Sequence, residues 1–456
     1  MTLLVSLLVF IPKVLIGFAI AHLLWEDSDI PAFVLKLSLG VPLGLAISAS
    51  LFFISMVAGL SPNTYSWIEF FGSLSLVLLL VLYAIITRKF PIKLVRPGWQ
   101  NIMSISTVLA GALLLLGAFR AYSRLHPYGF EDAWTIWNFS SRFIFRDNSP
   151  AILLNSQFYN RFHPDYPVEL SLNVAWGWFI LKDETPGIPI ALALLSTITL
   201  GTVFWATLAK WKGFVAAAIG TLIIFSLIDL PAVIGQYADP LFTLHILSAT
   251  ALFYGYLKTR QSGILILSGL LAGFSAWVKN EGILFTCVLS IICLIAMIRQ
   301  LIKWNELKFF AMGLFGPLLV VLTYKRTVTW QNDLFSSANS PFLQLLDLSR
   351  WLLIGKSFVI SIMDYVRSPI SIVIILLIYI LLIGFDKNET KYHTLLFLVF
   401  GGQLAGYFFI YLITPHNLQL HIATSIGRLA SHLFPLAILW IFAGLHSPNL
   451  SIKNQA

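Results

Sequence analysis

The stretch HPYGFEDAWTIWNFSSRFIFRDNSPAILLNSQFYNRFHPDYPVE, residues 126–169, interrupts a chain that is otherwise strongly apolar. Charged residues, aromatic residues and prolines crowd together here between two long apolar segments. A membrane-spanning helix needs about 20 consecutive, mostly apolar residues, so none can be drawn through this stretch. In a chain made mostly of spanning helices, we expect chemistry to occur where the polar residues gather.

The overall composition indicates a membrane protein. Of 456 residues, 58% are hydrophobic and only 11% are charged, which is more apolar surface than a soluble core can enclose. The formal net charge of +9 could attract nucleic acid, but the basic residues are spread over short loops and form no basic face. We therefore predict a polytopic membrane protein that binds membrane lipids and no nucleic acid.

Apolar runs of roughly 17 to 25 residues predict about thirteen spanning helices. The predicted fold class is therefore all-α, a polytopic transmembrane helical bundle. The predicted helices lie near residues 3–24, 33–58, 66–87, 101–121, 188–209, 213–231, 239–257, 263–279, 282–299, 309–325, 369–384, 394–413 and 429–446.

Lysine and arginine in the connecting loops predict the orientation, because such loops favour the cytoplasm. Basic residues occupy alternate connections, at 88–96, 210–212, 258–260 and 299–308. The N-terminus is then outside and the tail 447–456 inside. Two long loops, about 121–186 and 326–368, fall on the outer face. The acidic loop 25–30 opposes this orientation, although acidic residues contribute little to the rule.

Both outer loops contain amphipathic segments. In the first, Trp134, Trp137, Phe143 and Phe145 recur at helix-like spacing, which predicts a helix lying in the headgroup layer. The second ends in residues 345–365, again amphipathic and too polar for a clean span. Reading that segment as a spanning helix would reverse the orientation of the last three helices.

Glu131 and Asp132 follow the fourth predicted helix on the outer side. A carboxylate held between aromatic rings near a bilayer loses hydration, which makes it a better proton acceptor near neutral pH. We therefore consider both as candidate catalytic bases. The alternative is a solvated loop acid, or an Asp132 that caps a helix over residues 133–145.

The motif RFHPDYP supplies Arg161, His163 and Asp165. Histidine and aspartate can ligate a metal, but two ligands do not make a metal site. The prolines of the motif favour a rigid structural turn. Contact with a phosphate or a sugar is the alternative.

Two further clusters lie on the same predicted face. In QYADP, Asp239 either caps the next helix or is a second acid that faces Glu131 and Asp132. In KNEG, Lys279 and Glu281 stand in a tight turn, where a charge costs on the order of 2.5 to 3.5 kcal/mol at the bilayer centre and less near its edge. They either pair with each other, or Lys279 meets an anion.

The last cluster precedes the final predicted helix, in PHNLQLHIATSIGRL. His421, Ser425 and Arg428 are spaced i, i+4 and i+7, so they share one helical face. Either these residues are structural, or the face binds a ligand.

All five clusters lie on one predicted side of the membrane. A transporter would place polar groups near the middle of discontinuous helices, commonly in repeated halves. The predicted helix interiors here carry almost no charge, so we expect a site that opens at the outer surface.

At these positions the chain resembles the GT-C superfamily of membrane glycosyltransferases, in its bacterial branch related to protein mannosyltransferases and aminoarabinose transferases. The resemblance runs from about residue 110 to 435. Residues 1–100 then look like an added three-helix segment, and 101–446 like the transferase module. The motifs that carry it are EDAWTIWNFSSR, HPDYP, YADP, WVKNEG and HIATSIGRL.

The resemblance implies an integral enzyme of the plasma (inner) membrane with its active site on the extracytoplasmic side. The donor would be a polyprenyl-phosphate sugar, and the acceptor a lipid, glycan or protein. No metal ligand is assigned, and a divalent metal is left open. Asp132 matches the catalytic base, with Glu131 as the alternative, and Asp239 a second acid. Residues expected to bind the donor phosphate or another part of the substrate are Lys279, Arg428, Arg142, Arg161, His163, Asp165, Glu281 and His421.

Two other functions compete with this one. A transporter or flippase of a lipid-linked saccharide would share the amphipathic loops and the anion contacts, and would move its substrate without covalent change. A noncatalytic scaffold would use the acids only as helix caps. Sugar transfer to a defined acceptor separates the enzyme from both.

Overall fold

The structure is a computed structural model that describes residues 3–87, 99–152, 163, 165–327, 344–367 and 370–448. Every regular element within these ranges is a helix, and a single isolated bridge joins Phe385 to Leu445. The predicted all-α class is confirmed for this part of the chain.

Ten helical stretches among the described residues are long and apolar enough to cross a membrane. The protein is therefore a multi-pass integral membrane protein. The ten are α1 with α2 (Leu3–Leu8 and Ile11–Leu24), α3 (Ile30–Val57), α4 (Pro62–Thr87), α5 (Trp99–Leu125), α9 (Gly187–Trp211), α12 (Asp239–Thr259), α14 (Glu281–Ile298), α15 (Trp304–Thr327), α19 (Thr390–Ile413) and α20 (Leu418–Gly444). Shorter apolar helices are α10 (Phe214–Ser226), α13 (Ser262–Val278) and α18 (Ile370–Ile383).

The predicted segments coincide with these helices, but some boundaries were wrong. The segment 213–231 contains a break, after which Asp229 caps the short helix α11 (Leu230–Ile234) by accepting from the Ala232 amide. The final helix starts at Leu418, capped by Asn417, and not at 429. The polar face of His421, Ser425 and Arg428 therefore lies inside a spanning helix and not before it.

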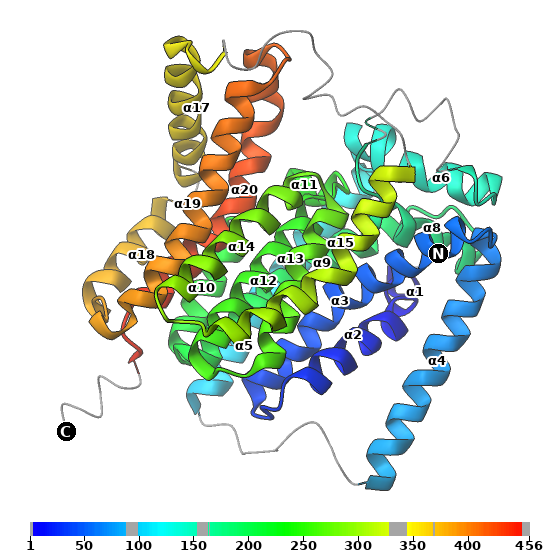
Figure 1. The fold of residues 1–456 in the computed structure, drawn as a ribbon, viewed down its shortest axis with the longest axis horizontal. Helices are drawn as coiled ribbons and strands as arrows, with labels where there is room; N and C mark the ends of the chain where they lie inside the picture. Colours follow the sequence, from blue (N-terminus) through cyan, green and yellow to red (C-terminus); the bar gives the residue numbers. More distant parts are fainter. Residues whose placement is uncertain are drawn as a thin grey trace.

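The most enclosed helices form the centre of the molecule. In Figure 1, α3, α9, α12 and α13 run side by side through the body, and α17 to α20 lie together at one end. The apolar window of α12 is 94% buried, whereas that of α4, which slants away from the body, is 17% buried. The central α3 belongs to the segment 1–100, whose status as an added unit stays a prediction.

The first predicted outer loop is only partly a surface loop. The amphipathic segment is helical, as η1 (Ala133–Trp137), which is a π-helix, followed by α6 (Asn138–Asp147). However, the loop also contains α8 (Glu169–Leu181), which is buried against α3, α4, α6 and α9. With only 13 residues, Glu169 and Asn173 among them, α8 is too short to be predicted as a span.

The second predicted outer loop holds the amphipathic helix α17 (Leu348–Arg367), which leans on α19 and α20. The Arg350 Nη2 donates to the Tyr411 carbonyl at 2.9 Å and to the Thr414 carbonyl at 3.3 Å, which fixes one end of α17. Residues 328–343 and 368–369 of that loop lie outside the described ranges.

Glycines allow α2 and α3 to approach closely. A Cβ on Gly17 would lie 2.6 Å from the Gly44 nitrogen, and one on Gly40 would clash with the Val14 carbonyl oxygen. Lipid-embedded helices have no hydrophobic drive toward each other, so small residues and close packing supply the attraction.

We predict that Gly40→Val lowers the free energy of unfolding by about 1–3 kcal/mol, because the added carbons force α2 and α3 apart. The matched control is Gly72→Val in α4, where an added Cβ meets nothing within 4 Å. Thermal unfolding in detergent measures both. An equal effect of the two variants would contradict the packing account.

Candidate functional site

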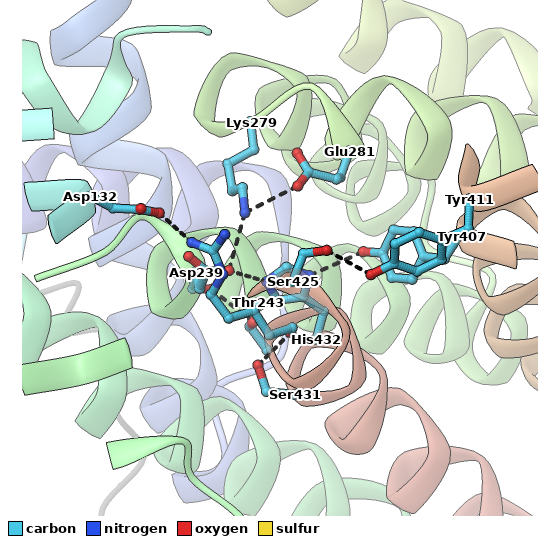
Figure 2. A network of polar contacts seen from close by, with 11 residues as sticks. Asp132, Asp239, Thr243, Lys279, Glu281, Tyr407, Tyr411, Ser425, Ser431 and His432 are labelled. Atoms are coloured by element: carbon cyan, nitrogen blue, oxygen red, sulfur yellow. Dashed lines mark hydrogen bonds and ion pairs between the residues drawn. The ribbon is translucent and has the colours of Figure 1, made fainter. Parts of the chain in front are cut away.

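Charged side chains from distant parts of the chain meet in one network, which Figure 2 shows from close by. The network joins the start of η1, the first residue of α12, the turn between α13 and α14, and the middle of α20. Its charged or titratable members are Asp132, Asp239, Lys279, Glu281, Arg428 and His432.

Asp239 lies at the centre of the network and is buried. Its Oδ1 accepts from the Lys279 Nζ at 3.1 Å and from the His432 Nε2 at 2.8 Å. Its Oδ2 is also buried and has no hydrogen-bond partner among the described residues. Asp239 is the first residue of α12, but its carboxylate caps no backbone amide there, so the capping interpretation was wrong.

The KNEG turn is as tight as the sequence predicted. Helix α13 ends at Val278 and α14 begins at Glu281, with extended backbone at Lys279. The ammonium of Lys279 lies 3.1 Å from the Glu281 Oε1 as well as 3.1 Å from Asp239. One cation therefore bridges two carboxylates, and the predicted pairing of Lys279 with Glu281 is confirmed.

Asp132 forms an ion pair with Arg428, across 296 positions of sequence. Its side chain makes no capping hydrogen bond, because the carboxylate is directed at the guanidinium. Both side chains are about one-quarter exposed, 24% for Asp132 and 27% for Arg428. The neighbouring Glu131 is exposed. The structure thus brings the predicted base Asp132 and a predicted phosphate ligand into direct contact.

His432 was missed by the sequence analysis. It is fully buried, and its two ring nitrogens contact the Asp239 carboxylate and, at 3.1 Å, the Tyr407 hydroxyl. A neutral ring with its proton on Nε2 satisfies both contacts, donating to Asp239 and accepting from Tyr407. The signal was present, because His432 follows Arg428 by four residues and extends the same helical face.

Two tyrosines lie beside the ion pair: Tyr166 of the RFHPDYP cluster and Tyr237 of QYADP, neither of which was assigned a role from the sequence. The Arg428 guanidinium lies 5.4 Å from the ring centroid of Tyr237, within range of a cation–π contact. Burial raises the pKa of Tyr237 to about 12, and the Asp132 carboxylate adds to this rise. Burial, followed by the charge of Glu281, raises the pKa of Tyr166 well above its usual value. Both hydroxyls therefore stay protonated at neutral pH.

The HPDYP motif packs against the KNEG turn. Asn280 donates to the Asp165 Oδ2 at 2.8 Å and accepts from the Lys325 Nζ at 2.7 Å. The His163 ring stacks on Tyr166 with centroids 4.9 Å apart. Asn280 thus binds the HPDYP motif, whereas its neighbours Lys279 and Glu281 belong to the charged network. The motif forms a structural support beside that network.

Two other predicted site residues bind partners outside the charged members of the network, although the His421 ring lies 5.0 Å from the ring of Tyr411, which Figure 2 draws in the network. Arg142 is 3.9 Å from Glu184, which also binds Arg146 on α6. The His421 Nδ1 is 3.0 Å from the Thr414 hydroxyl. Arg161 lies outside the described residues. In the described part of the chain, no three His, Cys, Asp or Glu side chains gather as a metal-ligand group.

A small pocket, with room for only a few water molecules, borders Asp239 between α9, α10, α11, α12 and α20. Most of its lining is apolar. Its polar lining residues are Thr197, Asp229, Asp239, Thr243 and Ser431, and its apolar ones include Leu200, Ile224, Leu227, Val233 and Phe434. A ligand here would meet hydrocarbon walls beside a buried acid.

Comparison of the chain with protein-family models, with curated proteins and with solved structures found no match. The resemblance to glycosyltransferases therefore depends on the motifs alone. The structure itself establishes a multi-pass helical membrane protein in which several of those motifs meet.

We predict that Lys279→Met destabilises the fold by about 3–5 kcal/mol, because it leaves the buried Asp239 without its cation. The double variant Lys279→Met/Asp239→Leu should lose much less than the sum of the single variants. Thermal unfolding in detergent measures the cycle.

The control for this cycle is Arg146→Met, which breaks the partly exposed ion pair with Glu184. A pair of that kind contributes about 0–1 kcal/mol. Additive losses in the cycle would contradict a direct interaction between Lys279 and Asp239.

Proposed function

We propose that this protein is an integral-membrane glycosyltransferase of the GT-C kind. It moves a sugar from a polyprenyl-phosphate donor to an acceptor hydroxyl and inverts the anomeric configuration. One observation supports the proposal: acids and cations from four motifs of the resemblance meet in one half-buried cluster (Figure 2). The four motifs are EDAW, YADP, KNEG and HIATSIGRL.

The proposed roles follow from the chemistry of inverting transfer. Asp132 takes a proton from the acceptor hydroxyl as that oxygen attacks the anomeric carbon on the face opposite the phosphate. The departing polyprenyl phosphate gains negative charge, which Arg428 stabilises by direct contact and the buried Lys279 only by its field at longer range. Tyr166 and Tyr237 add neutral hydroxyl donors beside the ion pair.

The pocket beside Asp239 supports contact with an apolar group of the substrate, because its walls are mostly hydrocarbon, but it is too small to hold a polyprenyl chain. The proposed location is the plasma (inner) membrane, with the network on the extracytoplasmic side. This orientation is inferred from the lysine and arginine residues of the loops.

A second candidate function, transport of a lipid-linked saccharide, is favoured by a separate observation. Ionisable groups are also buried away from the network: Lys13 in α2, and Glu169 in α8, a helix outside the predicted spans. The Glu169 Oε1 lies 3.6 Å from the Nε2 of the buried His245. Buried ionisable groups at membrane depth often mark a transport pathway.

We predict that Asp132→Asn abolishes sugar transfer, by at least about a hundredfold, because the isosteric amide cannot accept the proton. The measurement is transfer of label from radiolabelled polyprenyl-phosphate sugars to a lipid or glycan extract, using purified protein. Asp183→Asn, an exposed acid ahead of α9, is the control and should retain wild-type transfer.

Equal transfer by wild type and Asp132→Asn would eliminate Asp132 as the base and direct attention to Glu131 and Asp239. No transfer by wild type with any donor, together with movement of the lipid-linked sugar across vesicle membranes, would favour the flippase.

A further inference from the structure

The proposed base and a proposed phosphate ligand are bound to each other. Arg428 donates through Nη1 to the Asp132 Oδ2, and its guanidinium lies over the Tyr237 ring. The Asp132 oxygen that faces the guanidinium already accepts a charge-assisted hydrogen bond, so it cannot at the same time accept a hydrogen bond from an acceptor hydroxyl. Something has to separate this pair before Asp132 can act as a base.

The other cations of the network are also engaged. Lys279 bridges Asp239 and Glu281, and His432 contacts Asp239 and Tyr407. The network counts three carboxylates against the two permanent cations Lys279 and Arg428. An incoming anion therefore meets no surplus of positive charge and has to replace one of the carboxylates.

Exposure indicates which carboxylate is replaced. The Lys279 side chain is only 5% exposed, so an anion cannot reach it in place of Asp239, which is 2% exposed, or of Glu281, which is 19% exposed, without unpacking the helices. Arg428 and Asp132 are 27% and 24% exposed. A guanidinium has five N–H donors in a planar fork that matches a phosphate oxygen pair as well as it matches a carboxylate.

We propose that Asp132 and a phosphate-ester anion compete for Arg428, so that binding of the anion releases the Asp132 carboxylate. The competition itself needs only the observed ion pair. Its catalytic meaning depends on the proposed function: the donor phosphate switches on the base, and the enzyme binds its donor before it activates the acceptor. In the absence of donor, Arg428 holds Asp132 inactive.

Binding assays without any sugar transfer test the exchange. The probe is farnesyl phosphate, titrated into the purified full chain in nanodiscs. Asp132→Asn should bind it about tenfold more tightly than wild type, because the competing charge is gone. Arg428→Gln should bind it about tenfold more weakly. The double variant Asp132→Asn/Arg428→Gln should bind farnesyl phosphate no more tightly than Arg428→Gln alone.

Two further probes identify the source of the anion. Farnesol has the same chain without the charge, and its binding should not respond to Asp132→Asn. Glycerol phosphate has the charge without the chain. If Asp132→Asn binds both farnesyl phosphate and glycerol phosphate more tightly than wild type does, Asp132 exchanges with any phosphate ester. If only the affinity for farnesyl phosphate rises, Asp132 exchanges with a lipid headgroup.

The matched control is Glu389→Gln, which releases Lys212 and Lys258 from a cation–carboxylate contact elsewhere. It should leave the affinity for farnesyl phosphate unchanged. An equal gain in Glu389→Gln, or unchanged or weaker binding by Asp132→Asn, would overturn the proposal. If Asp132→Asn does not fold, Asp132→Ser removes the same charge and carries the same expectation.

The result separates this inference from the proposed function. Transfer that is lost in Asp132→Asn with unchanged affinity for farnesyl phosphate would refute the exchange and keep the enzyme. A tenfold gain in affinity with no transfer from any donor would keep the exchange and refute the enzyme.

Discussion

The ion pair of Asp239 with Lys279 is the contact on which the rest of the network depends. Both side chains are buried among apolar helices, where an unpaired charge is strongly destabilising. Each residue can therefore sit there only because the other does. The contact ties α12 to the turn between α13 and α14, and His432 extends it to α20. The charged network and the packing of α12, the α13–α14 turn and α20 thus share one interaction.

Around this centre the protein places its charges in layers of decreasing burial. Asp239 and Lys279 are inaccessible and hold the geometry of the helices, whereas Asp132 and Arg428 are partly exposed. The proposed exchange depends on this division, because it requires an inner pair that keeps the frame and an outer pair that a ligand can reach. The π-helical turn that follows Asp132 is a feature often found at functional sites.

The sequence analysis and the structure differ at identifiable places. Long apolar runs were predicted well, because a spanning helix needs a minimum length of hydrocarbon regardless of its neighbours. Helix α8 was missed, since a buried helix of 13 residues within a bundle obeys no such rule. Capping was proposed for Asp132 and Asp239 from their local position, and both side chains instead bind distant cations.

The sequence by itself determined that the chain is a multi-pass helical membrane protein, and it pointed to Asp132, Asp239, Lys279 and Arg428 as unusual groups in an apolar chain. Burial of charge is costly enough that such residues stand out without any structure. Only the tertiary structure decided which of them are partners, and that His432 completes the set. Pairing depends on how helices separated by up to 296 positions pack together, and no local pattern encodes that distance.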